Sequence, residues 1–194
     1  VEWVQSDIRR DIPTAIKADL VTLFYVLNEL EEKQRLQVVE QLWNQCTGVF
    51  ALVEPGTPEG WKRLMRHRDQ LIALGGQVIA PCLHQLTCPV AEPDWCHFSQ
   101  RVSRSKAHRL AKQATVPYED EKFAYLAVSR IEASPSFARV LARPLHGSGK
   151  SSLKLCQTDG RLSQVMLTKR DGQAYKSARK LEWGDLYEPD TESN

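Results

Sequence analysis

Residues 19–26 read DLVTLFYV, a nearly continuous apolar run of residues that favour β-strands. A run without polar alternation is typical of a strand that is buried on both faces of a parallel sheet. The next segment, Glu31–Cys46, has helical spacing, with one apolar face made of Leu36, Val39, Leu42 and Trp43. This stretch therefore predicts a strand followed by a helix, the repeating unit of an α/β sheet.

The flanking segments extend this pattern in both directions. Val1–Gln5 is predicted to be the end of a strand, Gly48–Val53 is a second buried strand, and Pro58–Leu74 is a helix whose proline suits the first turn. Gln77–Ala80 is predicted to be a short strand. Residues 1–79 should thus form one unit, part of an open and mostly parallel α/β sheet. Because the chain starts with Val1 inside a strand, we expect a further N-terminal segment to complete the fold.

The character of the sequence changes after residue 79. Residues 80–117 are predicted to hold a cysteine-rich metal loop, Pro81–Cys96, and a basic helix, Phe98–Ala114. Residues 118–187 are predicted to form an antiparallel β tail, because short apolar segments alternate with glycine-containing turns. The strand candidates are Phe123–Arg130, Arg139–Pro144, Ser152–Cys156, Arg161–Thr168 and Gln173–Ser177. Residues 188–194 are polar and acidic and are expected to be a disordered tail.

Charge is unevenly distributed along the chain. Residues 1–96 contain 9 basic and 13 acidic side chains, residues 97–180 contain 17 and 6, and residues 181–194 contain 0 and 5. The basic block suits a phosphate backbone and favours a nucleic-acid-binding surface over one that is merely solvated. Its candidate residues are Arg101, Arg104, Lys106, Arg109, Lys112 and Lys150. No apolar run approaches the roughly 20 residues that span a bilayer, so we expect no membrane partner.

Three of the five cysteines lie within fifteen residues, at the spacing Cys82-x5-Cys88-x7-Cys96. Their loop has little apolar content, so a bound metal is the natural source of its order. Nothing in the sequence suggests secretion, which disfavours disulfides. Cys156, on a predicted strand, is the best candidate for a fourth thiolate. Cys46 is expected to be an ordinary buried thiol.

The identity of the metal stays open on these grounds. His84 or His97 could replace one cysteine, and a mixed set of ligands would favour zinc. Four thiolates suit either zinc or an iron–sulfur cluster. Zinc sites usually place two cysteines only about two to four residues apart. The wider spacings in this chain therefore favour the bulkier cluster, with zinc as the alternative.

The segment HGSGKSS, residues 146–152, looks like a phosphate-binding loop but does not fit one. That motif requires a glycine where this chain has Pro144, and a helix where a strand is predicted. We interpret the segment as a hairpin turn. No Gly-x-Gly-x-x-Gly motif occurs, and no Ser/His/Asp set has sequence support, so the catalytic residues, if the protein is an enzyme, are unknown.

Six longer strings carry a resemblance to a known family: DLVTLFYVLNEL (19–30), LVEPGTPEG (52–60), APC (80–82), DWCHFSQR (94–101), YEDEKF (118–123) and ARKLEWGD (178–185). Over almost its full length the chain resembles the methyltransferase-like small-ribosomal-subunit assembly family, which has mitochondrial and bacterial members. The resemblance implies the C-terminal half of a class I methyltransferase (Rossmann-like) sheet. It implies a [4Fe–4S] site with Cys82, Cys88, Cys96 and Cys156 as its ligands. It also implies binding to small-subunit rRNA, in the bacterial cytoplasm or the mitochondrial matrix.

S-adenosylmethionine is the cofactor that this resemblance implies for the full-length protein. Its glycine-rich loop and the acidic residue after the second strand lie in segments that this chain does not contain, so the chain alone should hold the cofactor poorly. Asp7 occupies the place of the side chain that meets the adenine, and Tyr25 and Asn28 follow the strand near the sulfonium. Each has a plainer role, because Asp7 can cap a turn and Asn28 a helix.

Two functions are therefore expected. The first is an assembly or translation factor that binds rRNA, in which the metal centre ties the cysteine loop to the β tail. The second is an active S-adenosylmethionine-dependent rRNA methyltransferase. It lacks support because neither an Asn-Pro-Pro-aromatic loop nor a cysteine nucleophile follows the relevant strands. A redox protein would rest on the cluster alone.

Overall fold

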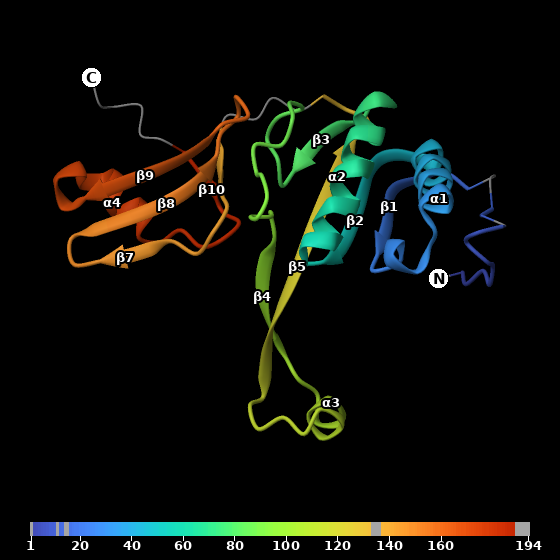
Figure 1. Ribbon diagram of the computed structural model, residues 1–194, viewed down its shortest axis with the longest axis horizontal. Helices are drawn as coiled ribbons and strands as arrows, with labels where there is room; N and C mark the ends of the chain where they lie inside the picture. Colours follow the sequence, from blue (N-terminus) through green and yellow to red (C-terminus); the bar gives the residue numbers. More distant parts are fainter. Residues whose placement is uncertain (1, 11, 14–15, 133–136, 189–194) are drawn as a thin grey trace.

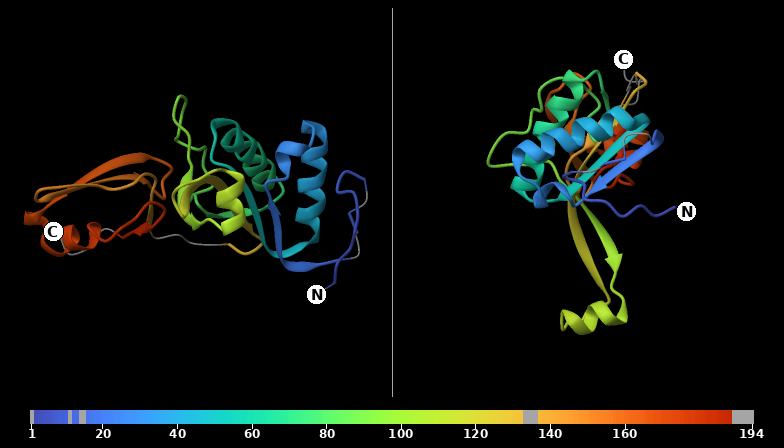
Figure 2. Two further views of the ribbon diagram at one scale, coloured as in Figure 1. Left: turned by 90° about the horizontal axis from the view of Figure 1, so that it is seen from below. Right: turned by 90° about the vertical axis from the view of Figure 1, so that its right-hand side faces the viewer.

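The computed structural model describes residues 2–10, 12–13, 16–132 and 137–188. They form a mixed sheet with two long helices, and a smaller antiparallel sheet beside it (Figure 1). A hairpin arm with a short helix at its tip projects from the first sheet (Figure 2). Val1, part of the predicted N-terminal strand end, and residues 189–194, part of the predicted disordered tail, lie outside the described residues. Within the described ranges, no helix is long and apolar enough to cross a membrane.

The first sheet begins with the predicted alternation of strands and helices. Its elements in chain order are β1 (Ala18–Phe24), the 3-10 turn η1 (Leu27–Glu29), α1 (Glu32–Gln45), β2 (Cys46–Pro55), α2 (Pro58–Ala73) and β3 (Gln77–Ala80). β1 and β2 are parallel, whereas the later strand Tyr118–Ser129 pairs antiparallel with β2, with β3 and with residues 98–103, so the prediction of a mostly parallel sheet is wrong. The strand and helix order predicted for residues 19–80 is confirmed. The strand end predicted at the N-terminus is wrong, because residues 2–6 form no strand.

Both long helices start where the sequence supplies a cap. Glu31 and Gln34 form a reciprocal capping box at the start of α1. Thr57 caps α2, because its hydroxyl accepts a hydrogen bond from the Gly60 amide at 3.1 Å. Pro58 then occupies the first turn. α1 and α2 contact each other and pack on the sheet, where they bury the main apolar core.

β5 (Tyr118–Ser129) is the strand that organises both the first sheet and the arm. Its residues 123–129 pair antiparallel with β2, and residues 127–129 also pair with β3. Residues 118–123 pair instead with β4 (Phe98–Ser103), and this pair of strands forms the arm. The segment 118–187, expected to be one β tail, is therefore divided between two sheets: β5 belongs to the first, and the second starts at Ala138.

The helix predicted over Phe98–Ala114 is wrong in its first half. Residues 98–103 are a strand because a long-range partner, β5, supplies a regular ladder from Phe98 opposite Phe123 to Ser103 opposite Tyr118. The helix α3 covers only Lys106–Ala111, after Ser105 caps it.

The prediction that the first strand is buried on both faces is also wrong. In β1, Leu20 is 61% exposed and Phe24 is 48% exposed. β1 lies at the end of the strand order, so it has a paired neighbour on one side only. Leu23, by contrast, faces the helices and is 4% exposed. The sheet therefore has one face packed by helices and one open face at this strand.

The second sheet is antiparallel, as predicted. Its strands are β6 (Ala138–Val140), β7 (Leu145–Gly147), β8 (Lys150–Cys156), β9 (Leu162–Thr168) and β10 (Leu186–Tyr187). β7 and β8 form the expected hairpin, with Gly149 at φ +76° in its turn. The strand predicted over Gln173–Ser177 is wrong: after the 3-10 turn η2 (Lys169–Asp171), residues 172–178 form the helix α4 (Gly172–Ala178). Tyr175 and Ala178, three residues apart, bury one helical face against the sheet.

Candidate metal centre and RNA-binding surface

The cysteine loop runs from β3 to β4 and lies between the two sheets (Figure 1). Cys82 is buried, and Cys88 and Cys96 are partly buried. All three line one small space with apolar side chains of α2, β4 and β5, namely Trp61, Leu64, Met65, Phe98, Ala124 and Tyr125. What remains of that space holds no more than about one water molecule.

Cys156 reaches the same place from the end of β8, in the second sheet. Its Sγ lies 3.5 Å from Nε2 of His84, a buried residue of the cysteine loop. Burial, followed by the charges of Cys82 and Cys88, raises the pKa of the Cys156 thiol to about 12. Burial and the other three thiols likewise hold the pKa of Cys96 well above its ordinary value. The structure thus brings the four predicted cysteines together from two sheets.

Cys46 stands apart from this group. It starts β2, is 3% exposed and belongs to the main apolar core. Its position agrees with the expected role of a plain buried thiol.

The four thiols do not form a preorganised site for a single ion. Within the described ranges, no three His, Cys, Asp or Glu side chains are grouped closely enough to hold one metal ion. Zinc draws its four donors to about 2.3 Å when they are sulfur. A four-iron cluster bonds each thiolate at a different corner, so its sulfur ligands lie farther apart than those around one ion. Four cysteine sulfurs are, in their chemistry, donors that suit either zinc or an iron–sulfur cluster.

Two polar atoms next to the cysteines support a site that holds a further group. Nδ1 of His84 and Nε of Arg68 are buried, and neither has a hydrogen-bond partner in the described part of the chain. Buried polar atoms in native proteins are nearly always satisfied by protein, water or ligand. Both residues lie near the cysteines: the positive charge of Arg68 acts on Cys82, Cys88 and Cys156, and the other ring nitrogen of His84, Nε2, lies 3.5 Å from Sγ of Cys156.

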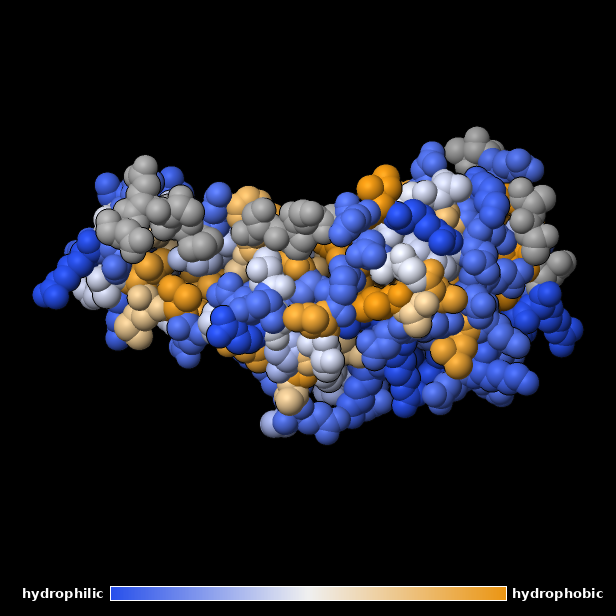
Figure 3. Space-filling view, turned by 90° about the horizontal axis from the view of Figure 1, so that it is seen from above, coloured by the Kyte–Doolittle hydropathy of each residue, from blue (hydrophilic) through white to orange (hydrophobic). Residues whose placement is uncertain are grey.

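Direct contacts also join the cysteine loop to the second sheet. Nε of Arg139 donates to the carbonyl of Pro81 at 3.1 Å, and Lys154 forms an ion pair with Asp94. The ring of His97 lies 5.0 Å from that of Trp95 and 4.9 Å from that of Trp183, measured between centroids. Seen from above, apolar side chains are visible along the middle of the molecule, where the two sheets meet (Figure 3).

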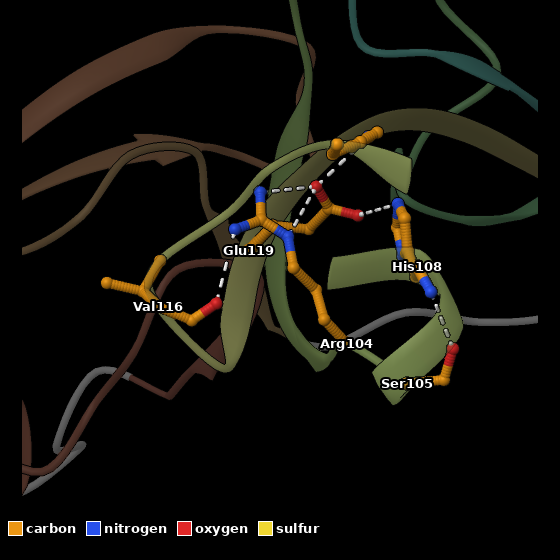
Figure 4. Close-up of polar contacts among 6 residues, drawn as sticks. Arg104, Ser105, His108, Val116 and Glu119 are labelled. Carbon is orange, nitrogen blue, oxygen red and sulfur yellow. Dashed lines mark hydrogen bonds and ion pairs between the residues drawn. The ribbon is translucent and has the colours of Figure 1, made fainter. Parts of the chain in front are cut away.

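The predicted RNA-binding residues of the arm fall into two groups. In the first, the side chains already have acidic partners. Glu119 of β5 accepts hydrogen bonds from Arg104 at 2.7 Å and Lys112 at 3.2 Å, and lies 3.4 Å from His108 (Figure 4). Hydrogen bonds from Arg104 and then Lys112 lower the pKa of Glu119 to about 2. Arg101 pairs with Asp120 at 2.8 Å. These contacts hold α3 against the strands of the arm.

The second group comprises Lys106, Arg109 and Lys150. All three are exposed, and none forms an ion pair with a residue that the structure describes. Lys106 and Arg109 lie on α3 at the tip of the arm, whereas Lys150 lies in the β7–β8 hairpin of the second sheet. Lys150 therefore belongs to a different sheet from the other predicted residues. On the tip helix, Lys106 and Arg109 are the cations that are available to bind phosphates.

The three predicted cofactor residues each have their own local environment. Asp7 forms hydrogen bonds with the backbone and side chain of Arg9, and the side-chain contact is the main cause that lowers its pKa to about 2. Tyr25 is 50% exposed and has a positive φ of 57°. Asn28 donates to Glu29 at 2.9 Å. Among the described residues, no hydrogen bond or ion pair links Asp7 with Tyr25 or Asn28.

Sequence reasoning did not single out Arg68 or Glu119. Arg68 had a usable signal, because it follows Leu64 by four residues and precedes Leu71 by three, in the middle of the buried face of α2. A charged residue on an apolar helix face indicates a buried partner. Glu119 gave no such signal, because its three partners depend on the pairing of β4 with β5.

The described fold and the cysteine group define a mixed α/β protein whose two sheets meet at a thiol-rich junction. The chain belongs to the Rsm22 family: the model of the family described as mitochondrial small ribosomal subunit Rsm22 matches residues 1–188. It is 33% identical over 201 residues to the human ribosome assembly protein METTL17, mitochondrial, which covers 92% of this chain and 41% of the human protein.

A second relative comes from fission yeast. The chain is 24% identical over 221 residues to the Rsm22-cox11 tandem protein 2, mitochondrial, of Schizosaccharomyces pombe, and the match covers 88% of this chain. The chain spans 29% of that protein and 41% of the human one, so it corresponds to less than half the length of either relative.

Proposed function

We propose that this chain is part of a small-ribosomal-subunit assembly factor that binds rRNA and acts in the mitochondrial matrix. The family description names the mitochondrial small ribosomal subunit, and the human relative is named a ribosome assembly protein. The projecting arm supports rRNA as the ligand, because its tip helix offers two cations that are available for phosphates. In a bacterial member the same role would belong to the cytoplasm.

The observation that carries the proposal is the meeting of the four cysteines between the two sheets. We propose that Cys82, Cys88, Cys96 and Cys156 hold a structural [4Fe–4S] cluster, with zinc as the alternative metal. When bound, the cluster would supply four strong metal–thiolate bonds. The chain itself supplies the apolar walls from α2 and β5, which exclude water, and the contacts of Arg139 and Lys154, which align the second sheet on the loop.

Such a centre would couple metal binding to RNA binding. β4 begins two residues after Cys96 and runs directly into the arm, so order in the cysteine loop sets where the arm starts. Phe98, its first residue, is 3% exposed and packs beside Tyr125 with ring centroids 5.1 Å apart. A metal-free loop would loosen this anchor, and the cations of the arm would no longer be held in one orientation.

The test is association of the full-length protein with the small subunit. In the Cys88→Ser variant we expect co-sedimentation with the small subunit to be lost, because one thiolate is missing and the loop loses its order. Cys46→Ser is the matched control, since it makes the same chemical change in a buried cysteine of the main core. Normal co-sedimentation of Cys88→Ser at moderate salt would contradict the structural role of the centre.

Methyl transfer from S-adenosylmethionine has no comparable support. Asp7 and Asn28 contact neighbouring residues, and the backbone amide of Tyr25 donates to the carbonyl of Val53 at 2.8 Å; these contacts do not indicate a cofactor. We therefore leave methyl transfer outside the proposal; transfer of labelled methyl groups to small-subunit rRNA by the full-length protein is the assay that would add it.

A further inference from the structure

Arg68 is the most deeply buried charged side chain near the cysteines. It lies on α2 and is 1% exposed, among the largest fully buried side chains of the described residues. On the same helical face are Leu64 and Leu71, both 0% exposed. An arginine stays protonated in proteins, so a full positive charge lies in an otherwise apolar layer.

Arg68 donates one long hydrogen bond to the exposed carboxylate of Asp69, at 3.4 Å, and its shorter hydrogen bonds are made to the cysteine loop. One terminal nitrogen donates to the carbonyl of His84 at 3.0 Å and to that of Leu86 at 2.6 Å. These bonds hold the turn between Cys82 and Cys88. They orient the loop, but neutral carbonyls do not balance the charge.

No buried anion balances that charge in the described part of the chain. The nearest carboxylate, Asp69, lies 3.4 Å away, and its side chain is 77% exposed. Nε of Arg68 has no hydrogen-bond partner there. A buried cation whose ion-pair partner is exposed to solvent is only weakly compensated, and buried charges in proteins usually lie beside a buried opposite charge.

The groups that face Arg68 are the thiols themselves. Its charge acts on Cys82 in the same loop, on Cys88 farther along it, and on Cys156 from the second sheet. Four thiolates carry more negative charge than one zinc ion or a four-iron core carries positive charge. A loaded centre is therefore a net anion, and it would place a buried negative charge near the guanidinium, which the exposed Asp69 does not supply.

We propose that Arg68 is the buried counter-ion of an anionic metal–thiolate centre and the residue that positions its loop. This inference rests on the proposed function, since it requires Cys82, Cys88, Cys96 and Cys156 to bind metal. It adds a residue on α2, outside the ligand set, that sets how tightly the metal is held. A nearby positive charge also favours the reduced, more negative state of a cluster, so it raises the reduction potential.

The experiment compares Arg68→Met, Arg68→Lys and Arg66→Met in the anaerobically purified full-length protein. Metal content, the rate of metal loss to a chelator and the midpoint potential of the centre are measured for each. Arg66→Met is the matched control, because Arg66 lies on the same helix, is 62% exposed and pairs with Glu32 on the surface.

We expect Arg68→Met to lose metal about 10- to 100-fold faster than the wild type, the usual effect of removing a group that supports metal ligands. Its remaining cluster should have a lower potential. Arg68→Lys keeps the positive charge but lacks the planar set of donors of a guanidinium. Its midpoint potential should therefore be closer to that of the wild type than its rate of metal loss is. Arg66→Met should match the wild type.

The outcomes separate the two proposals. A wild-type protein without metal would contradict the proposed metal centre. If Arg68→Met contains metal, and its rate of metal loss and midpoint potential equal those of Arg66→Met, the role of Arg68 is contradicted but the metal centre is not. If Arg68→Met does not fold, Arg68→Lys decides. A midpoint potential close to that of the wild type, with faster loss of metal, would support the counter-ion role of Arg68, and a potential as low as that expected for Arg68→Met would overturn it.

Discussion

The two sheets differ in how much apolar surface each can bury. The first sheet and its helices share one extended core that includes Trp43, Phe50 and Leu126, each at most 1% exposed. In the part of the chain that the structure describes, the second sheet has a smaller core of buried residues, Ala138, Val140, Leu153, Leu155, Ala178 and Tyr187. Because apolar burial is the main favourable term in folding, the first sheet should be stable by itself and the second only marginally.

The difference gives the cysteine junction a physical role. A small β unit with little core needs a further source of order, such as a metal or a larger neighbour. Cys156 lies at the end of β8, the strand that pairs with three others in the second sheet. A metal bond at this point would fix the weaker sheet to the stronger one. The following predictions test that unequal dependence.

The largest effect is expected from Cys156→Ser in the full-length protein. Without this ligand, amide hydrogen exchange should become fast in the cysteine loop and in residues 138–187, and stay slow in β2 and α2. Hydrogen exchange with mass spectrometry measures both regions in one experiment. In Cys46→Ser both regions should keep their relative protection. If Cys156→Ser lost protection against hydrogen exchange equally in both sheets, the second sheet would not depend on the metal more than the first.

The next effect is a loss of core packing in the first sheet. Leu126 lies in β5 and is 0% exposed, so Leu126→Ala should lower the free energy of unfolding by about 2–5 kcal/mol. Leu110→Ala, at a 71% exposed position of α3, should change it by no more than about 0.5 kcal/mol. Denaturant titration followed by tryptophan fluorescence gives both values. Similar losses for the two variants would contradict the assigned core.

A moderate effect is expected on rRNA affinity from the tip of the arm. The double variant Lys106→Gln/Arg109→Gln removes two cations without ion pairs, so the slope of log K against log salt should fall by about 1–2. Arg101→Gln should change the slope less, because Asp120 already pairs with Arg101. Lys33→Gln, in the acidic half, is the control and should have no effect. An unchanged slope for the double variant would exclude the tip helix from the interface.

The smallest effect concerns the pH dependence of the tip helix. The folded-state pKa of Glu119 is lowered from 4.5 to about 2, so its contacts contribute fully above the unfolded value. They are lost as the pH falls from about 5 toward 2, when the carboxylate is protonated. NMR signals of residues 106–111 should report local loosening over this range. Glu119→Gln should loosen the helix at neutral pH and remove that dependence; a wild-type-like titration of the variant would contradict it.

Much of the first sheet could be predicted from local pattern. The apolar run of residues 19–26 was sufficient to predict a strand, and the helical spacing of Glu31–Cys46 was sufficient to predict a helix. Each of these patterns lies within a single element. The exposure of Leu20 could not be predicted, since it depends on what covers the strand. β4 and α4 were missed for the same reason: their state is decided by β5 and by the second sheet, which are distant in sequence.

The candidate site shows the same division. The spacing of Cys82, Cys88 and Cys96 within one loop indicated three metal ligands, and Cys156 was predicted as the fourth from a strand. The structure places Cys156 near the other three. The partners of the cations were not predictable, because Glu119 meets Arg104 only across the hairpin of the arm. Arg68 was missed because the helical pattern shows which face is buried, but not which loop the face meets.

The central claim is that the four cysteines hold a cluster that joins the two sheets. Iron, sulfide and zinc analysis of the anaerobically purified full-length protein, with its visible absorption spectrum, tests it most directly. We expect a brown protein with about four irons per chain, and loss of that iron in Cys156→Ser but not in Cys46→Ser. A colourless protein with one zinc, or with no metal, would contradict the cluster.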